Sequence, residues 1–77
     1  MRKLSLLQMR ANQKGKVLEI TGGIGLVNRL MSMGIYKGKE IAKLSQFALR
    51  GPVAIKVNRS VLALGHGMAS KIILEIE

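Results

Sequence analysis

The sequence predicts a small, mainly β fold in which five short strands, interrupted by one helix, close into a barrel. Glycine divides the chain into short segments, and most of these alternate apolar and polar residues with the period of a strand. A single stretch, residues 24–33, has the apolar period of a helix instead. Closure of the sheet explains how so few residues would avoid exposed strand edges.

The first half of the chain predicts a strand, a tight turn and the helix. β-Branched residues and alternation favour a strand at Lys16–Thr21. Gly22 and Gly23 then form the strand-to-helix turn. The helix at residues 24–33 carries apolar residues over roughly half of its wheel. Gly34 stands just past the helix end, where a left-handed backbone conformation is usual.

The middle of the chain predicts two further strands. Lys37 and Gly38 form a turn into a strand that runs from Lys39 to about Leu44. Pro52 closes the loop after it, because proline has no amide with which to continue a ladder. Val53–Val57 follows as the clearest strand of the chain, with alternate residues on opposite faces.

The last third of the chain predicts a hairpin, one helical turn and a final strand. Asn58 takes a left-handed conformation at low cost, which suits a tight hairpin turn into Ser60–Leu64. Two glycines limit residues 66–70 to at most one helical turn, since each costs about 1 kcal/mol within a helix. Ile72–Ile76 alternates again and forms the fifth strand.

Composition indicates one small domain that spans residues 1–77. The chain has 77 residues, of which 48% are hydrophobic, enough for a packed core. It has no cysteine, which excludes disulfides, thiolate metal sites and thiol chemistry. No stretch approaches the about 18 consecutive apolar residues of a membrane span. We therefore expect a soluble, cytoplasmic protein that is monomeric in isolation.

Candidate catalytic and cofactor-binding groups are few. The acids are four glutamates, and three of them fall in or beside predicted strands, where a solvated outer face is the usual explanation. His66 is the only histidine, and a metal site would need several such ligands. Gly22–Asn28 resembles the start of a dinucleotide-binding unit, but Asn28 replaces the third glycine and no acid follows the second strand. We expect no enzyme activity, no metal site and no cofactor.

The chain is strongly basic. Thirteen Lys and Arg residues oppose four acids, which gives a net charge of +9. Small basic barrels often bind nucleic acid through phosphate contacts. Single-strand binders add aromatic stacking platforms, however, and only Tyr36 and Phe47 are available here. Because the charges are also spread from Arg2 to Lys71, nucleic-acid binding is the alternative function rather than the first. Attraction to the anionic inner face of a membrane is a further alternative.

The methionines are expected to fill gaps in the core. Met31, Met33 and Met68 lie on apolar stretches, where a flexible thioether side chain usually packs inside. Met9 is expected to pack beneath the N-terminal segment. A methionine metal site does not fit this spacing.

Three segments, in this order and spacing, resemble the FeoA family. The most specific is residues 29–41, Arg-Leu-Met-Ser-Met-Gly-Ile-Tyr-Lys-Gly-Lys-Glu-Ile, in which an Arg-Leu helix end is followed by two glycines and a strand. The second is Pro52–Val57 followed by residues 62–64, Leu-Ala-Leu. The third, Met68–Leu74, is similar to the closing strand of the family. The resemblance extends from about Leu6 to Ile76.

This chain departs from the family pattern at three turns. Asn12 stands where members usually have glycine, and asparagine tolerates a left-handed conformation. Residues 49–52 read Leu-Arg-Gly-Pro in place of the common Leu-Gly-Asp-Pro. Arg59 replaces the hairpin glycine, which implies a different turn type. The added arginines make the chain more basic than many relatives.

The resemblance implies an SH3-like barrel and a non-enzymatic, regulatory role beside FeoB, a ferrous iron transporter of the bacterial membrane. The expected partner is the cytosolic GTP-binding domain of FeoB or its membrane-proximal face. Direct carriage of ferrous ion is a weaker alternative. Similar domains occur at the C-termini of iron-dependent repressors, so the fold does not settle the partner.

We expect docking through the polar side of the helix and the turn after it. The candidate residues are Arg29, Ser32, Tyr36 and Lys37. Tyr36 is the expected anchor, because aromatic side chains dominate the energies of interfaces.

Overall fold

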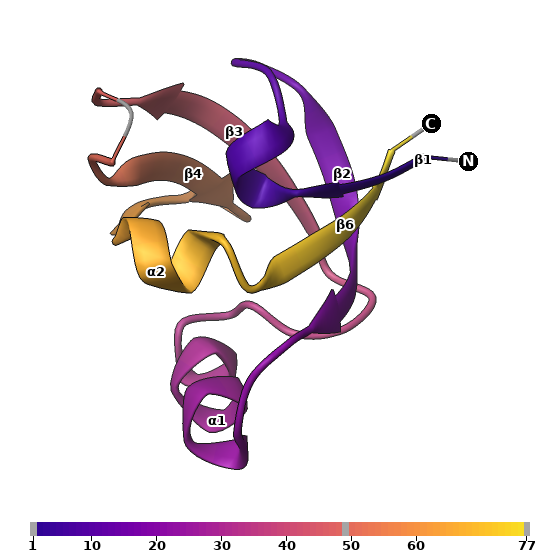
Figure 1. The fold of residues 1–77 in the computed structure, drawn as a ribbon. Coiled ribbons are helices and arrows are strands. Elements are labelled where there is room, and N and C mark those ends of the chain that lie inside the picture. The colour runs from indigo at the N-terminus through magenta and orange to yellow at the C-terminus, as the bar shows by residue number, and fades with distance from the viewer. Residues whose placement is uncertain (1, 49, 77) are drawn as a thin grey trace.

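The computed structural model describes residues 2–48 and 50–76, which form one antiparallel sheet of six strands with three short helices (Figure 1). Helix α1 lies below the sheet in Figure 1, and the 3-10 helix η1 lies beside α2, which it contacts. The elements in chain order are β1 (Arg2–Ser5), η1 (Leu6–Gln8), β2 (Lys14–Ile20), α1 (Ile24–Ser32), β3 (Glu40–Gln46), β4 (Val53–Val57), β5 (Ser60–Leu64), α2 (His66–Ala69) and β6 (Ile72–Ile76).

The fold is mainly β, as the sequence predicts, and its strand order is β1-β6-β2-β3-β4-β5. All five predicted strands are present, and β4, β5 and β6 have the predicted bounds. The additional strand, β1, is not predicted, because its residues, Arg-Lys-Leu-Ser, do not alternate between apolar and polar. Arg2 and Lys3 are both exposed. Pairing with β6, from Arg2 opposite Ile76 to Ser5 opposite Ile73, is what makes this segment a strand.

The sheet keeps two edges, contrary to the expectation that it would have none. Among the described residues, β1 and β5 stand at the two ends of the hydrogen-bonded order. Helices η1 and α2 complete the core through side chains instead of strand pairing. They contribute Leu6 and Ala69, which are both fully buried.

The core is built from the inward-facing residues of the alternating strands. In β4 these are Val53, Ile55 and Val57, all buried. The ladder shifts register at Leu18 in β2 and at Leu44 in β3. Such bulges bend a strand and increase its twist, which lets a sheet of short strands curl around a small core.

A Schellman motif ends α1 and fixes the chain that leaves it. The Ile35 N–H donates to the carbonyl of Leu30 at 2.9 Å, and the Gly34 N–H donates to that of Met31 at 3.0 Å. Gly34 has a φ of 88°, in the left-handed region expected for this position. Leu30 and Ile35 are fully buried, as is usual for the apolar pair that accompanies the motif.

The other turn residues named from the sequence divide into two groups. Gly38, Asn58 and Asn12 have positive φ values, of 94°, 58° and 68°. Gly22 and Gly23 do not, and Gly23 is instead the extended N-cap residue of α1. The two glycines therefore form the strand-to-helix connection without a left-handed conformation.

Lys43 in β3 is a buried charge. Its side chain is 4% exposed. The ammonium group donates to the carbonyl oxygens of Leu7 and Met9 at 3.1 and 2.8 Å, and to Gln46 Oε1 at 2.9 Å. Burial lowers the pKa of Lys43 below its ordinary value of 10.5, because desolvation penalises the charged form. The side chain thus ties the end of η1 to β3, and the expected burial of Met9 is confirmed beside it.

Replacement of Lys43 by methionine should lower the free energy of unfolding at neutral pH by about 1–3 kcal/mol, because two carbonyl oxygens lose their partner. The wild type should gain stability relative to Lys43→Met as the pH rises towards 10.5. The unfolded chain binds the proton more tightly than the folded chain, so stability rises between the two pKa values, by at most about 1.4 kcal/mol per pH unit.

Urea unfolding between neutral and alkaline pH measures both effects. Lys14→Met is the matched control, because Lys14 is an exposed lysine on the neighbouring strand β2 and stands opposite Ala42, not an acid. Equal stability of the two variants at neutral pH would contradict the structural role of Lys43.

Candidate interaction surfaces

Helix α1 is attached to the barrel along one side only. Leu30 is fully buried, and Leu26 and Met33 are half-buried against the core. These residues fall within about 60° of one another on the helical wheel. The helix projects from the barrel in Figure 1, so most of its surface faces outwards.

The outward surface of α1 includes an apolar stripe, formed by Ile24, Val27 and Met31. The spacing i, i+3, i+7 places these side chains on one face of the helix. Ile24 is 74% exposed and Met31 is 53% exposed, while Val27 is half-buried. The prediction that Met31 fills a gap in the core is therefore wrong: the apolar half of the wheel is wider than the side that the barrel covers.

The predicted docking residues Arg29 and Ser32 lie together on a different side of α1. Both are exposed, and the Ser32 hydroxyl donates to the carbonyl of Arg29 at 2.7 Å. Arg29 lies about 140° from Ile24 around the helix, so this pair does not border the apolar stripe. Tyr36, in the turn that follows, is 42% exposed.

Lys37 lies in the connection between α1 and β3. It lines a hollow of about 360 Å³ together with Lys3, Leu18, Glu19 and Glu75. The four predicted docking residues therefore do not form one patch around the helix: two lie on α1, and Lys37 lines a hollow that two acids of its own chain also line.

The outer face of the sheet carries two rows of charge, set by the strand register. In the first row, Lys3 stands opposite Glu75, Glu75 opposite Lys16, and Lys16 opposite Glu40. Opposite charges alternate along this row, and such cross-strand pairs stabilise a sheet by about 0.2–1 kcal/mol each. Glu19, Glu40 and Glu75 thus lie on the outward face, as the sequence predicts, and Glu77 lies outside the described residues.

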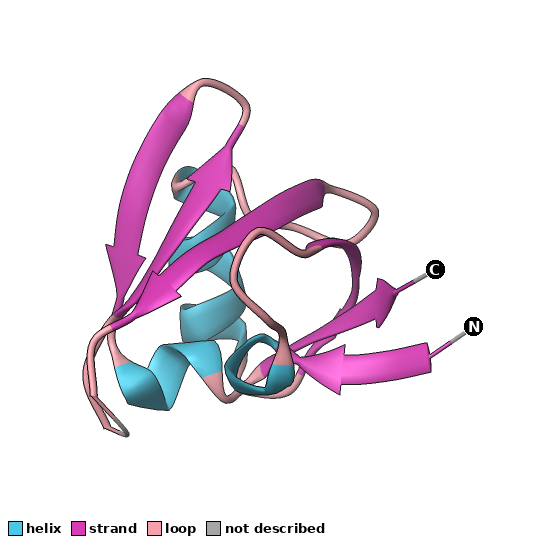
Figure 2. Ribbon diagram, turned by 90° about the horizontal axis from the view of Figure 1, so that it is seen from above, coloured by secondary structure: helices cyan, strands magenta, loops and turns pink. Residues whose placement is uncertain are grey.

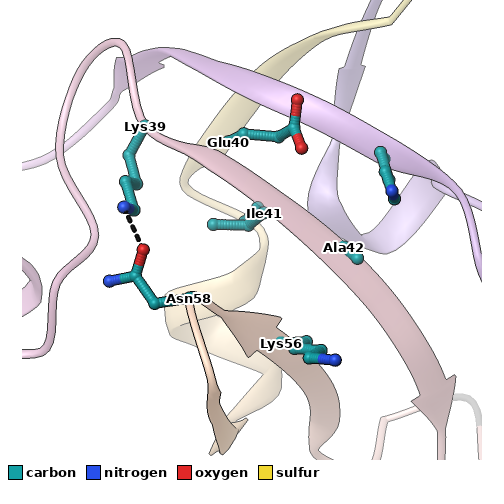
Figure 3. A pocket seen from close by; sticks show the side chains of 7 residues that line it. Lys39, Glu40, Ile41, Ala42, Lys56 and Asn58 are labelled. Carbon is teal, nitrogen blue, oxygen red and sulfur yellow. Dashed lines mark hydrogen bonds between the residues drawn. The ribbon is translucent and has the colours of Figure 1, made fainter.

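The second row contains two lysines and no acid. Lys14 stands opposite Ala42, and Ala42 opposite Lys56, across β2, β3 and β4. We call Lys14, Ala42 and Lys56 the lysine row. It crosses a hollow of about 310 Å³, whose other lining residues include Glu40 and Asn58 (Figure 3). Lys39 Nζ donates to Asn58 Oδ1 at its rim.

No cluster in the described part of the chain has the composition of a metal site. In residues 2–48 and 50–76, no three or more His, Asp or Glu side chains lie together so that they could hold an ion. His66 is half-buried at the start of α2. In the same residues, no helix is long and apolar enough to cross a membrane.

The structure adds two surfaces that sequence reasoning missed, the apolar stripe and the lysine row. The stripe is visible in the sequence as part of the wide apolar arc of the helix, but the arc does not show which part of it the barrel covers. The lysine row has no signal in the sequence, since Lys14 and Lys56 are brought together only by the register of three strands.

Comparison with known proteins relates the chain to ferrous iron transport. The model of a family described as the FeoA domain matches residues 4–76. The "Putative Fe(2+) transport protein A" of Methanocaldococcus jannaschii is 39% identical over 59 residues, a match that covers 77% of this chain and 70% of that protein. A crystal structure of an iron uptake regulatory protein (FeoA) superposes with a TM-score of 0.87 at 31% identity, over 97% of both chains.

A more distant likeness concerns the fold alone. A manganese-dependent transcriptional repressor superposes with a TM-score of 0.87 at 18% identity. The match covers 97% of this chain and 42% of the repressor. The same barrel is thus found within a larger protein.

Substitution of the apolar stripe should leave the fold intact. The double variant Ile24→Ser with Met31→Ser should change the free energy of unfolding by less than about 1 kcal/mol, because both side chains are mostly in solvent. Leu30→Ala should cost about 2–5 kcal/mol, because it leaves a cavity in the core. Urea unfolding of the two variants checks this, and a large loss from the serine variant would show that the stripe is packed inside.

Proposed function

Because the chain belongs to the FeoA domain family, we propose that it is a non-enzymatic accessory protein of ferrous iron uptake, which binds the cytosolic part of a FeoB-type transporter. The observation that carries the proposal is the match to relatives named for Fe(2+) transport and iron uptake over most of the chain. Regulation at the inner face of the membrane follows from such a partner, with the protein itself in the cytoplasm.

Helix α1 and the turn after it supply the docking surface. The apolar stripe offers the part of an interface that becomes fully buried, since the cores of interfaces are apolar and their rims polar. Tyr36 extends the contact as an aromatic anchor. Arg29 and Ser32 lie on another side of the helix and take part only where the partner wraps around it, and Lys37 lies outside the apolar contact.

The side chains present suit a protein that binds a partner through its surface better than they suit an enzyme. Glu40 and Glu75 stand opposite lysines on the outer face, and His66 belongs to no group of three or more possible metal ligands among the described residues. General acid–base work needs a positioned pair of such groups in a cleft. A docking protein needs only a surface of suitable shape and charge.

Binding to the isolated cytosolic domain of the transporter should depend on α1. The variant Ile24→Ser with Met31→Ser should weaken binding by about tenfold or more, because it removes the apolar core of the contact. Arg29→Ala with Tyr36→Ala should weaken it to a similar degree. Titration calorimetry at moderate salt measures both.

The control for these variants is Arg50→Ala, which removes one exposed positive charge far along the chain from α1. It should bind as the wild type does. Wild-type affinity in both α1 variants would rule out this docking surface, and no binding by the wild type would rule out the partner.

Nucleic-acid binding is the second candidate, and the lysine row is the observation that favours it. Phosphate contacts make such binding fall steeply with salt concentration. Because aromatic platforms are scarce, we expect no gel shift of RNA or DNA at micromolar protein and about 150 mM salt. A shift at this salt concentration that disappears in Lys14→Gln with Lys56→Gln would favour this candidate.

A further inference from the structure

Strand β5 has an unpaired edge. It pairs with β4 on one side and ends the strand order of the sheet on the other. In the described part of the chain, no backbone hydrogen bond is found on the free side of Ser60–Leu64. Viewed from above, the hairpin of β4 and β5 stands on the side of the barrel away from the two termini (Figure 2).

The hairpin register identifies the backbone groups on this edge. A two-residue loop, Asn58 and Arg59, joins the paired residues Val57 and Ser60. Positive φ at Asn58 alone is the pattern of a type II′ turn, which explains why arginine replaces glycine at the second position. Residues that flank such a loop exchange hydrogen bonds with each other, and the alternation then turns Val61 and Ala63 away from β4.

Val61 and Ala63 therefore present their N–H and C=O groups to solvent. Val61 is 64% exposed, and Ala63 is exposed as well. The two residues are two positions apart, which is the repeat of an antiparallel ladder on one side of a strand. A further extended segment can pair with them without displacing any part of the barrel.

The edge lacks the features that usually prevent such pairing. Free edges are commonly blunted by charged residues, proline or a bulge. Strand β5 contains no charged residue and no proline. Its register with β4 is uninterrupted from Val57 to Val53, so it has no bulge. The opposite edge, β1, does carry charge, at Arg2 and Lys3.

The charges around β5 indicate what kind of segment it accepts. The lysine row continues onto this strand, because Lys56 stands opposite Val61. Arg59 lies in the hairpin turn at the start of β5, and Glu40, at the far side of the hollow, is the nearest acid in the outer-face register. A second copy of the chain would bring another net charge of +9 to this edge, whereas an acidic segment would be attracted to it.

We infer that the free edge of β5 binds an extended, acidic segment of a partner protein by strand addition. The backbone of the segment pairs with Val61 and Ala63, and its outward acidic side chains lie within reach of Lys56 and Arg59. This site is separate from the docking surface on α1 and goes beyond the proposed function, since it does not depend on the transporter as the partner.

A synthetic peptide tests the inference on the full chain. The probe is a blocked nine-residue peptide of alternating glutamate and valine. Its control is the same peptide N-methylated at the glutamate amides, which keeps the charge and removes the N–H groups that would face Val61 and Ala63. On addition of the first peptide, the amide signals of Val61 and Ala63 should shift in NMR spectra and become protected from hydrogen exchange. The amide of Leu62, which already faces β4, should change less.

Variants of β5 separate backbone pairing from charge. Val61→Pro removes an N–H on the free edge, where proline is tolerated, and should weaken binding by about tenfold. Val61→Thr keeps the N–H and should bind as the wild type does. Lys56→Gln should weaken binding at low salt and have less effect at high salt. Circular dichroism shows whether each variant is folded, and Ala63→Pro repeats the test if Val61→Pro is not.

Three results would overturn the inference. One is the absence of shifts at Val61 and Ala63 at millimolar peptide. Another is equal binding of the N-methylated control, which would reduce the effect to charge alone. The third is protection of these amides that grows with protein concentration without peptide, which would assign the edge to a second copy. None of these results bears on the transporter, because the assay contains none.

Discussion

The N-terminal quarter of the barrel depends on one buried ammonium group. Lys43 donates from its side chain to the carbonyls of Leu7 and Met9, while its backbone N–H bonds to Gln13 and its backbone carbonyl accepts from Asn12. One residue of β3 thus holds both ends of the segment that joins η1 to β2. With that segment in place, η1 can complete the core on the side where the sheet has no strand pairing, and β1 reaches β6.

Local patterns predict most of this fold, and the failures have physical reasons. Val53–Val57 and Ile72–Ile76 alternate clearly because one face of each is buried. The Schellman end of α1 follows from a glycine after an amphipathic stretch. Strand β1 is invisible in the sequence, because pairing with β6 rather than an apolar pattern defines it. Lys43 could not be singled out, since its burial depends on carbonyl groups that lie 34 and 36 residues away in the chain.

The candidate surfaces were predictable to a smaller extent. Sequence reasoning selected α1 as the docking element and chose its polar side, Arg29 and Ser32. Met31, one residue of the apolar stripe, is predicted from the sequence to lie in the core, because a helical wheel gives no measure of how much of a helix its neighbours cover. The free edge of β5 was expected to be absent, because a closed barrel was the simplest way for a short chain to avoid one. Both surfaces are therefore exposed in the folded chain, although the sequence pattern favours covering them.

The two chain segments that flank α1 are held together by backbone hydrogen bonds. Beyond the paired residues of β2 and β3, the Val17 N–H donates to the carbonyl of Lys39, and the Gly38 N–H donates to the carbonyl of Val17, both at 2.8 Å. The helix is thus an excursion between two positions that the backbone already holds together. Its outward residues can change over evolution without altering the barrel that carries them. Partner choice and fold stability can accordingly be selected separately within one short chain.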